Sequence, residues 1–366
     1  MKFLVVAGAR PNFMKIAPIM DAFARRAATA HDFEVRLVHT GQHYDRAMSD
    51  GFFEDLGIPE PDIHLGAGSG SHAEQTARIM VAFEQVCISE CPDWVIVVGD
   101  VNSTLACSIT AKKLGIQVAH VEAGLRSRDM TMPEEINRLC TDAISDLLFT
   151  TDEMADDNLR AEGVSKEKVV FVGNTMIDTL LRHLDRAKQS PLPVGMSERG
   201  YAILTLHRPS NVDSPDTLGP LFAAIQRIAA MIPVVFPIHP RTRKNLETFG
   251  LLNETSNIQF LEPLSYLPFI GMVSRARLVL TDSGGIQEES TVLGVPCLTM
   301  RNNTERPITC SLGTNVLVGT DPERIYQEAI SVLENQQRPT VIPPKWDGRA
   351  GERIVDRLLD GHSLPC

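Results

Sequence analysis

Four side chains in the sequence could move protons, and each follows an apolar run or lies in a loop. Three are carboxylates in the first half of the chain, Asp100, Glu122 and Glu134, and the fourth is His207 in the second half. Carboxylate and imidazole groups act as general acids and bases within hydrogen-bond reach of a substrate. Any one of these acids is more often a helix cap or an ion-pair partner. Together they indicate proton transfer beside a bound ligand.

A short glycine-bearing segment could bind a phosphate group. The apolar run Leu278–Thr281 is followed by Asp282-Ser283-Gly284-Gly285, where a helix is expected to begin. Glycines let the backbone approach a ligand closely, and the free N–H groups of a helix start bind phosphate. Glu289, one turn further, could accept hydrogen bonds from ribose hydroxyls. The alternative is a tight strand–helix turn without a ligand, because glycines at such turns also serve packing alone.

Basic residues follow predicted strands in both halves of the chain. Arg10 and Lys15 come after the first apolar run, and His239 and Arg241 follow another run in the second half. Cations at the carboxyl ends of strands suit a small anionic ligand. The alternative for Arg10 and Lys15 is that they are ordinary surface charges.

The elements that must position these residues are short apolar runs that alternate with amphipathic stretches. The strand-like runs are Phe3–Ala7, Val35–His39, Trp94–Val98, Gln117–Val121, Leu147–Thr150, Val169–Val172, Tyr201–Leu206, Pro233–Pro237, Ile258–Phe260, Leu278–Thr281, Cys297–Met300 and Asn315–Leu317. Helical periodicity separates most of them, for instance at Thr104–Leu114 and Leu218–Met231. Runs rich in Val, Ile and Leu with little alternation are typical of parallel strands that helices cover on both faces. The pattern repeats on either side of about residue 190, which predicts two doubly wound lobes with a ligand in the cleft between them.

Length and composition limit the possible function classes. The 366 residues predict two domains; we place an N-terminal lobe at 1–175, a C-terminal lobe at 176–347, and a helix at 348–362 that packs back onto the first lobe. With 43% hydrophobic and 22% charged residues the chain is an ordinary globular protein, and its net charge of −11 argues against a nucleic-acid partner. The seven scattered cysteines contain no Cys-x-x-Cys pair and indicate reduced thiols in a cytoplasmic protein. No segment is long enough to span a membrane.

Two further patterns do not indicate a ligand site. His120 and Glu122 share one face of a predicted strand, but no third ligand with recognisable spacing accompanies them, so we expect no metal site. The segment Gly66-x-Gly68-x-Gly70 does not follow the first strand, and it predicts a loop capped by Ser71 before a helix rather than a dinucleotide site.

The motifs together resemble those of the non-hydrolysing UDP-N-acetylglucosamine 2-epimerases, a family with the two-lobed GT-B glycosyltransferase fold. The resemblance runs nearly end to end, through Gly8-Ala9-Arg10-Pro11, Gly99-Asp100, His120–Arg126, Pro133–Arg138, His207-Arg208, Asp282–Glu289 and Glu305-Arg306-Pro307. So many motifs in order make the resemblance specific. The fold by itself would not, because it hosts many transferases.

The resemblance implies an α/β enzyme with two Rossmann-like lobes that interconverts UDP-N-acetylglucosamine and UDP-N-acetylmannosamine, with neither NAD nor a metal as cofactor. In the family the C2 proton is removed and UDP is expelled from C1, which gives 2-acetamidoglucal. UDP is then added back with the C2 proton on the other face. Carried over by motif, Asp100, Glu122 and Glu134 would be the acid/base carboxylates and His207 would assist. Which of them takes the C2 proton stays open.

The resemblance also implies which residues hold the UDP-sugar, and it implies a homodimer. The set is Arg10, Lys15, Gln42, His239, Arg241, Phe269, Ser283, Gly284, Gly285, Glu289 and Arg306. The helix start at Ser283, with Arg10 and Lys15, would stabilise the charge that grows on UDP. Glu289 would hold the ribose and Phe269 would flank the uracil, although Phe269 could equally be an ordinary core residue.

Some segments depart from the family pattern. The stretch between Arg126 and Pro133 is shorter than in the best-known enterobacterial members, and Pro209-Ser210 replaces their usual residues; both features occur in a recognisable branch of the family. The segment Gln42-His43-Tyr44-Asp45 lacks the second glutamine found where some members bind an activating UDP-N-acetylglucosamine, which counts against an allosteric site. Three alternatives stay open: a hydrolysing relative that releases UDP and N-acetylmannosamine, a GT-B glycosyltransferase, and a catalytically silent regulator that binds a nucleotide sugar.

Overall fold

The chain is organised as two compact units. The computed structural model describes residues 1–28, 32–41, 55–252, 257–334 and 340–360, except for the side chain of Arg10. The first unit contains Met1–Arg182 and Pro344–Cys366, and the second contains His183–Pro343. Helix α7 (Thr175–Lys188) carries the chain from the first unit into the second. The chain therefore passes from one unit to the other after residues 182 and 343. The sequence predicts these two boundaries after residues 175 and 347.

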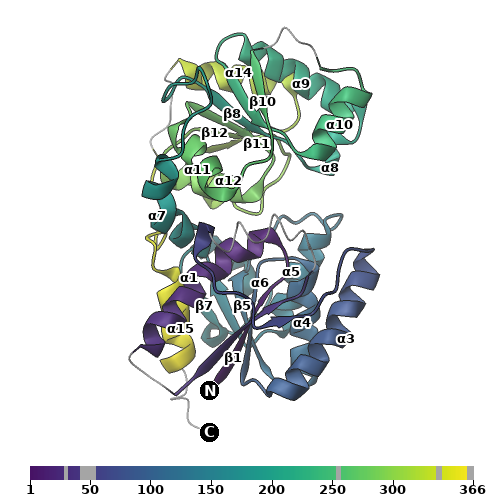
Figure 1. The fold of residues 1–366 in the computed structure, drawn as a ribbon, viewed down its shortest axis with the longest axis vertical. Helices are drawn as coiled ribbons and strands as arrows, with labels where there is room; N and C mark the ends of the chain where they lie inside the picture. The colour runs from purple at the N-terminus through teal and green to yellow at the C-terminus, as the bar shows by residue number, and fades with distance from the viewer. Residues whose placement is uncertain (29–31, 42–54, 253–256, 335–339, 361–366) are drawn as a thin grey trace. The chain divides into compact units, whose positions relative to one another are not determined.

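The first unit is built on a parallel sheet of seven strands in the order β3-β2-β1-β4-β5-β6-β7 (Figure 1). The strands are β1 (Lys2–Ala7), β2 (Glu34–His39), β3 (Ile63–His64), β4 (Trp94–Val98), β5 (Gln117–Ala123), β6 (Leu147–Thr150) and β7 (Val169–Phe171). All residues of β4 are buried, which explains why its sequence is an unbroken apolar run instead of an alternating one.

Helices cover both faces of this sheet. They are α1 (Arg10–Ala27), α3 (His72–Glu90), α4 (Asn102–Lys113), α5 (Pro133–Ile144), α6 (Glu153–Ala161) and α15 (Ala350–Asp360), with a 3-10 turn at Lys166–Lys168. The neighbouring residues Phe3 and Leu4 of β1 point to opposite faces of the sheet. Leu4 packs in one cluster with Phe83 of α3, whereas the Phe3 ring lies 5.1 Å from the ring of Phe23 in α1. Helix α15 returns from the end of the chain and lies beside α1 (Figure 1).

The second unit repeats this design with six parallel strands in the order β10-β9-β8-β11-β12-β13. The strands are β8 (Ala202–Thr205), β9 (Val234–Pro237), β10 (Ile258–Leu261), β11 (Leu278–Thr281), β12 (Cys297–Thr299) and β13 (Asn315–Leu317). The helices are α8 (Pro209–Val212), α9 (Pro215–Ala229), α10 (Pro240–Thr248), α11 (Tyr266–Arg275), α12 (Gly284–Leu293), α13 (Ile308–Ser311) and α14 (Pro322–Leu333). Leu204 of β8 packs in a cluster with residues of α9, while its neighbour Ile203 packs with residues of α11. Both units are therefore doubly wound.

The returning segment and α15 are held to the rest of the first unit by side chains that donate hydrogen bonds to backbone carbonyls. The Trp346 indole N–H donates to the Thr151 carbonyl at 2.9 Å, and the Arg353 guanidinium donates to the Val172 carbonyl at 2.9 Å. Gly173 has a φ of +94°, and a Cβ atom there would lie 2.1 Å from the carbonyl oxygen of Lys345. Only glycine fits at this position without moving the returning segment.

We expect Gly173→Ala to lower the free energy of unfolding by about 2–4 kcal/mol, because it combines a left-handed backbone with an unavoidable clash. Gly163→Ala is the matched control, since Gly163 has a φ of +84° but open space around it, and its cost should be about 1 kcal/mol. Urea denaturation of the two variants measures the difference. Equal costs would contradict the contact described for Lys345.

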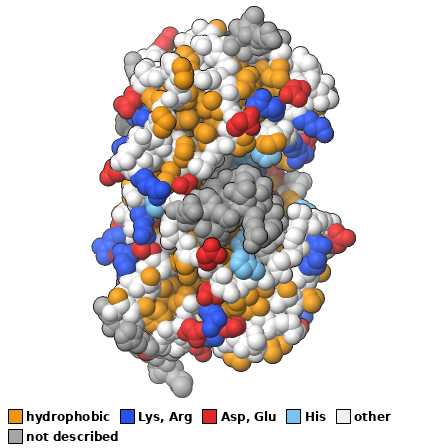
Figure 2. All heavy atoms as spheres, viewed as in Figure 1, with side chains coloured by type: hydrophobic (Ala, Val, Ile, Leu, Met, Phe, Trp, Pro, Cys, Tyr) orange, Lys and Arg blue, Asp and Glu red, His pale blue; other side chains and the backbone are white. Residues whose placement is uncertain are grey.

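Charged side chains of both signs are mixed on the face drawn in Figure 2. On the face seen in Figure 2, the Lys and Arg side chains are scattered among Asp and Glu instead of forming one continuous stripe. This face therefore does not show the clustered cations that binding to a phosphate backbone needs. Within the described ranges, no helix has both the length and the apolar character to cross a membrane.

Candidate active site

The strand order of each unit creates one place where a ligand is expected. In the first unit the order changes direction between β1 and β4, and in the second it changes between β8 and β11. Neighbouring strands at such a point send their connections to opposite faces, which opens a crevice at their carboxyl ends. The predicted site residues Lys15 and Asp100 follow β1 and β4, and His207 and Ser283 follow β8 and β11. The predicted residues of the first unit and those of the second unit therefore each lie where the strand order of their sheet changes direction.

Glu122 and Lys15 form a buried ion pair beside Gly99. Both side chains are less than one-tenth exposed, and a Cβ atom on Gly99 would lie 2.7 Å from the Lys15 Nζ atom and 3.3 Å from a Glu122 carboxylate oxygen. The pair thus lies directly against the backbone that leads from β4 to Asp100. Lys15, predicted as a contact to the leaving group, is in this structure the partner of a predicted acid/base residue.

The backbone at Glu122 is unusual for a residue with a side chain. The predicted strand ends at Val121, but β5 continues to Ala123, and its register with β6 shifts between Val121 and Ala123. Glu122 lies in this irregularity with a φ of +70°. Backbone strain of this kind costs roughly 1–3 kcal/mol and is concentrated at functional sites. The bulge also ends the strict alternation that would have put His120 and Glu122 on one face.

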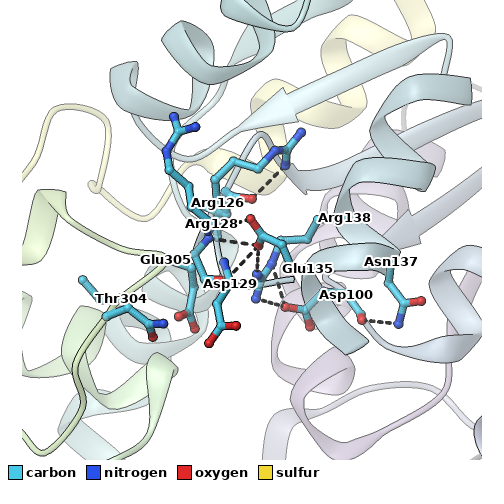
Figure 3. A network of polar contacts seen from close by, with 12 residues as sticks. Asp100, Arg126, Arg128, Asp129, Glu135, Asn137, Arg138, Thr304 and Glu305 are labelled. Carbon is cyan, nitrogen blue, oxygen red and sulfur yellow. Dashed lines mark hydrogen bonds and ion pairs between the residues drawn. The ribbon is translucent and has the colours of Figure 1, made fainter. Parts of the chain in front are cut away.

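Asp100 is held by Arg138, which α5 presents from its buried side (Figure 3). The Arg138 Nε and Nη2 atoms lie 3.0 and 2.6 Å from one Asp100 carboxylate oxygen. The Asn137 side chain donates to the Asp100 carbonyl at 2.8 Å. The Asp100 side chain is one-quarter exposed, so it is fixed in direction and still accessible.

Glu135, which is not among the predicted site residues, belongs to the same network (Figure 3). It is buried and accepts hydrogen bonds from the backbone amides of Ser127 and Arg128 at 2.9 and 2.8 Å and from Arg138 at 2.6 Å. Burial would raise the pKa of Glu135, but these hydrogen bonds outweigh it and hold the pKa below its ordinary value. The neighbouring Glu134 is exposed in the first turn of α5. Its acid/base role stays a prediction, and Glu135 is the residue that orders the loop before α5.

The buried residue His120 supports the backbone on which Asp100 lies. The two ring nitrogens of His120 lie 2.6 Å from an Asp142 carboxylate oxygen and 2.8 Å from the Gly99 carbonyl oxygen. Asp142 also accepts the Gly124 amide and pairs with Arg126. Burial would raise the pKa of Asp142, but the His120 and Arg126 charges and hydrogen bonds lower it below its ordinary value. His120 therefore fixes the backbone that carries Asp100, and both of its ring nitrogens are engaged by protein groups.

In the second unit, Asp282 orients the loop that carries His207. The Asp282 side chain is fully buried; it accepts the backbone amides of His207 and Arg208 at 3.0 and 2.8 Å and lies 2.9 Å from the His207 Nδ1 atom. Burial would raise the pKa of Asp282, but these hydrogen bonds and the His207 ring hold it below its ordinary value. About half of the His207 side chain stays exposed. A carboxylate that holds one imidazole nitrogen sets the tautomer and the direction of the other.

The N-terminus of α12 has the form expected of an anion site. Ser283 occupies the N-cap position but its side chain makes no cap hydrogen bond, so the first backbone N–H groups of the helix receive no capping oxygen from that residue. Gly284 lies under Arg306 and Glu305, because a Cβ atom there would come within 2.6 Å of an Arg306 nitrogen and 2.7 Å of a Glu305 oxygen. The predicted residue Arg306 is buried and its Nε lies 2.9 Å from Glu288 of the same helix.

Glu289 and Phe269, predicted to contact the nucleoside, lie on the packed helices α12 and α11. Glu289 is buried and accepts a hydrogen bond from the Tyr266 hydroxyl at 3.0 Å. Phe269 is half-buried and packs on one side against the cluster that contains Tyr201 and Met272. Its nucleoside contact stays a prediction.

The remaining predicted residues are placed differently or fall outside the description. His239 is the N-cap of α10, where its ring accepts the Arg241 amide at 3.2 Å, and the Arg241 guanidinium pairs with Asp213 at the surface. Neither contact indicates a ligand. Gln42 and the side chain of Arg10 lie outside the described part of the chain.

Comparison with known proteins identifies what this arrangement resembles. A family model described as UDP-N-acetylglucosamine 2-epimerase matches residues 25–359. A UDP-N-acetylglucosamine 2-epimerase of Methanococcus maripaludis is 42% identical, with both chains covered in full. A UDP-2,3-diacetamido-2,3-dideoxy-D-glucuronate 2-epimerase of Pseudomonas aeruginosa is 44% identical over 91% of this chain and 92% of its own length.

Solved structures give the same result. The UDP-GlcNAc 2-epimerase of Methanocaldococcus jannaschii in complex with UDP-GlcNAc and UDP is 41% identical, with a TM-score of 0.89 over 99% of this chain and 100% of that chain. The enzyme of Neisseria meningitidis bound to UDP-GlcNAc is 31% identical, with a TM-score of 0.89 over 98% and 100% of the two chains. The predicted α/β fold of the GT-B type is confirmed.

Proposed function

The chain belongs to the UDP-N-acetylglucosamine 2-epimerase family and is therefore an enzyme, and from that premise we propose that it reversibly converts UDP-N-acetylglucosamine into UDP-N-acetylmannosamine. The observation that carries the proposal is the group at the strand ends of the first unit, where Glu122 in a strained backbone pairs with Lys15 beside Asp100. Two carboxylates in different surroundings, one with a cation and one partly exposed, suit proton removal and proton return.

The proposed reaction is an elimination followed by a re-addition. A carboxylate takes the C2 proton as the C1–O bond breaks and its electron pair leaves with UDP, which leaves a C1–C2 double bond in 2-acetamidoglucal. UDP then re-adds at C1 and a proton is delivered to the opposite face of C2. A hydrogen beside an acetamido group is barely acidic, so its loss must be coupled to departure of a stabilised leaving group. The proposal requires the acids of the first unit and the anion-binding residues of the second to act on the same molecule.

The second unit supplies the charge stabilisation that this leaving group needs. Open N–H groups and the positive end of the helix dipole at Gly284 and Gly285 favour a diphosphate. His207, held by Asp282, can donate a proton or a hydrogen bond to the departing phosphate oxygen. UDP retained in this way stays available for the return step.

We expect Gly284→Ala to weaken UDP binding roughly tenfold or more, because the added methyl group displaces Arg306 and Glu305 at the helix start. Gly219→Ala is the control, since its nearest contact would be Leu251 at 3.9 Å, and its affinity should equal that of the unchanged protein. Isothermal titration with UDP measures both. Equal affinity for the two variants would place the diphosphate elsewhere.

A second substrate has specific support. The 44% identical relative from Pseudomonas aeruginosa is named for UDP-2,3-diacetamido-2,3-dideoxy-D-glucuronate, which differs from UDP-N-acetylglucosamine at C3 and C6 but would undergo the same reaction at C2. The relatives named above do not favour the hydrolysing alternative.

Product analysis with each nucleotide sugar tests the proposal. The protein is incubated separately with UDP-N-acetylglucosamine, with UDP-N-acetylmannosamine and with the diacetamido substrate. Proton NMR follows the anomeric signals in each reaction. We expect a mixture of UDP-N-acetylglucosamine and UDP-N-acetylmannosamine at a constant ratio reached from either side. Free N-acetylmannosamine with stoichiometric UDP would establish hydrolysis, and turnover of the diacetamido substrate alone would establish the second candidate.

A further inference from the structure

Buried polar side chains connect the start of α12 to the segment that carries Arg306. Gln287, the fourth residue of α12, is fully buried, and Asn315, the first residue of β13, is 3% exposed. The Asn315 Nδ2 group donates a hydrogen bond to the Gln287 Oε1 atom at 3.0 Å. Buried amides destabilise the fold unless their hydrogen bonds are made. The pair therefore holds a fixed geometry and does not merely fill space.

The hydrogen bonds of Gln287 fix the orientation of its amide group. Its Nε2 atom donates to the Ser283 carbonyl oxygen at 3.1 Å, whereas Oε1 accepts from the Thr304 hydroxyl at 2.7 Å as well as from Asn315. A carbonyl oxygen can only accept, so Nε2 must face Ser283 and Oε1 is left for the two donors. One orientation of the side chain satisfies all three partners.

The hydrogen bond to Ser283 sets the direction of the first N–H group of α12. The Ser283 carbonyl and the Gly284 N–H belong to one planar peptide unit, in which they point in opposite directions. A donor that holds the carbonyl therefore also holds the N–H on the other side of the unit. This N–H is one of the donors at the helix start that favour a diphosphate.

The same network holds the backbone of Arg306 on both sides. The Arg306 N–H donates to the Thr304 hydroxyl oxygen at 3.0 Å, and the Thr304 hydroxyl in turn donates to Gln287. The Arg306 carbonyl oxygen accepts from the Thr309 hydroxyl at 2.8 Å, and the Thr309 oxygen accepts from Asn315 at 3.2 Å. Each threonine thus transmits to Arg306 the position of a buried amide.

The Arg306 side chain lies against the helix start that Gln287 orients. Its guanidinium pairs with Glu288 and with Glu305, and a Cβ atom on Gly284 would come within 2.6 Å of one of its nitrogens. The two anion-binding elements, a backbone N–H and a guanidinium, are therefore positioned by one set of hydrogen bonds.

We propose that Gln287 is a positioning residue that aligns the Gly284 N–H and the Arg306 guanidinium on the diphosphate of UDP. This inference rests on the proposed function, because it takes UDP as the ligand at the start of α12. Gln287 is fully buried and engaged by protein groups, so it acts through Ser283 and Thr304. Donors that are fixed before binding need no reordering when the anion arrives, which strengthens binding.

Titration calorimetry of Gln287→Met with UDP tests the inference. Methionine has nearly the same length as glutamine but cannot make these hydrogen bonds, so the affinity for UDP should fall about tenfold or more. Gln327→Met is the matched control, because Gln327 is an exposed residue of α14 whose amide donates to Glu323 of the same helix. Its affinity for UDP should stay within about twofold of the unchanged protein. Unchanged affinity in Gln287→Met would overturn the inference.

Gln287→Glu separates the direction of the hydrogen bonds from the shape of the side chain. A neutral glutamic acid can donate to the Ser283 carbonyl and accept from Thr304, whereas the ionised form can only accept and turns a negative charge toward that carbonyl. Burial raises the pKa of a carboxyl group, so the neutral form is favoured at low pH. UDP affinity, relative to the unchanged protein at the same pH, should be within about threefold at about pH 5.5 and lower by about tenfold or more at about pH 8.5.

The ratio of affinities removes the titration of UDP itself and of the charged or titratable groups in this region that both proteins share. These groups include Asp282, Glu288, Glu289, Glu305, Arg306 and Cys310. A change of the ratio with pH therefore reports the protonation of the new carboxyl group.

The outcomes at the two pH values distinguish positioning from packing. Equally low relative affinity at both would show that position 287 serves packing alone, and affinity equal to that of the unchanged protein at both would show that the bond to Ser283 is not needed. Either result overturns the inference, although the unchanged protein still binds UDP and the proposed function stands. The proposed function fails if the unchanged protein does not bind UDP. If circular dichroism shows that Gln287→Met is unfolded, the pH dependence of Gln287→Glu decides.

Discussion

Glu122→Gln should abolish exchange of the C2 hydrogen while leaving UDP binding within about threefold of the unchanged protein. The amide has nearly the same shape but cannot take a proton, and loss of a positioned general base lowers the rate by about 10²–10⁴-fold. It also removes the negative charge opposite Lys15. The Lys15 cation that stays behind attracts the anionic UDP, so the substitution is not expected to weaken UDP binding through charge. Measurement of turnover by NMR and of UDP affinity by calorimetry separates the two effects.

The matched control is Glu153→Gln, an exposed carboxylate in the first turn of α6 in the same unit, which should retain full activity. If Glu122→Gln loses UDP binding along with turnover, then Glu122 has a structural role in holding the site. Full activity of Glu122→Gln would move the proton transfer to Asp100 or Glu134, the other predicted acids.

Asp282→Asn should lower kcat by about a hundredfold, with a smaller change in KM, because it disturbs His207 without removing it. An asparagine side chain offers one acceptor where Asp282 now accepts two backbone amides and faces the His207 ring. Its NH₂ group would face at least one of those donors. His207 would then lose both its tautomer preference and its fixed direction.

A double-variant cycle with His207→Ala checks this assignment. If Asp282 acts through His207, the double variant should be no slower than His207→Ala alone, since interacting residues are not additive. Multiplied losses would show that Asp282 acts independently of His207. Circular dichroism of each variant confirms that the second unit is folded.

Much of this architecture can be predicted from the sequence because parallel strands buried on both faces have a simple signature. The limits of β4, β6, β11 and β13 agree with the predicted runs, and the loop capped by Ser71 is confirmed by its hydrogen bond to the Glu74 amide. Strand β3 (Ile63–His64) was missed. Two residues at the edge of a sheet are too short for a hydrophobic pattern to appear.

The sequence predicts at which strand ends the site residues lie. It does not predict which of these residues pair with one another. Glycine-bearing turns after apolar runs locate Asp100 and Ser283, because the chemistry of such turns is local. The pairing of Lys15 with Glu122, and of Arg138 with Asp100, joins segments that are distant in the sequence. Spacing alone does not reveal such contacts.

Three residues that organise the site were not assigned these roles from the sequence. Glu135 and Asp142 are buried acids on α5 that order the loop and backbone around Asp100, and Asp282 was read as part of a phosphate-binding turn although it holds His207. Each lies within a polar motif. Burial, which distinguishes an organising acid from an exposed one such as Glu134, depends on tertiary packing.

Removal and return of the C2 hydrogen on the enzyme can be observed in deuterated water. The unchanged protein is incubated with UDP-N-acetylglucosamine, and both UDP-sugars are recovered and examined by NMR and mass spectrometry. We expect one deuterium at C2 in both epimers, with only traces of 2-acetamidoglucal and free UDP. Epimers that form without deuterium at C2, or a substrate that is recovered without exchange, would contradict it.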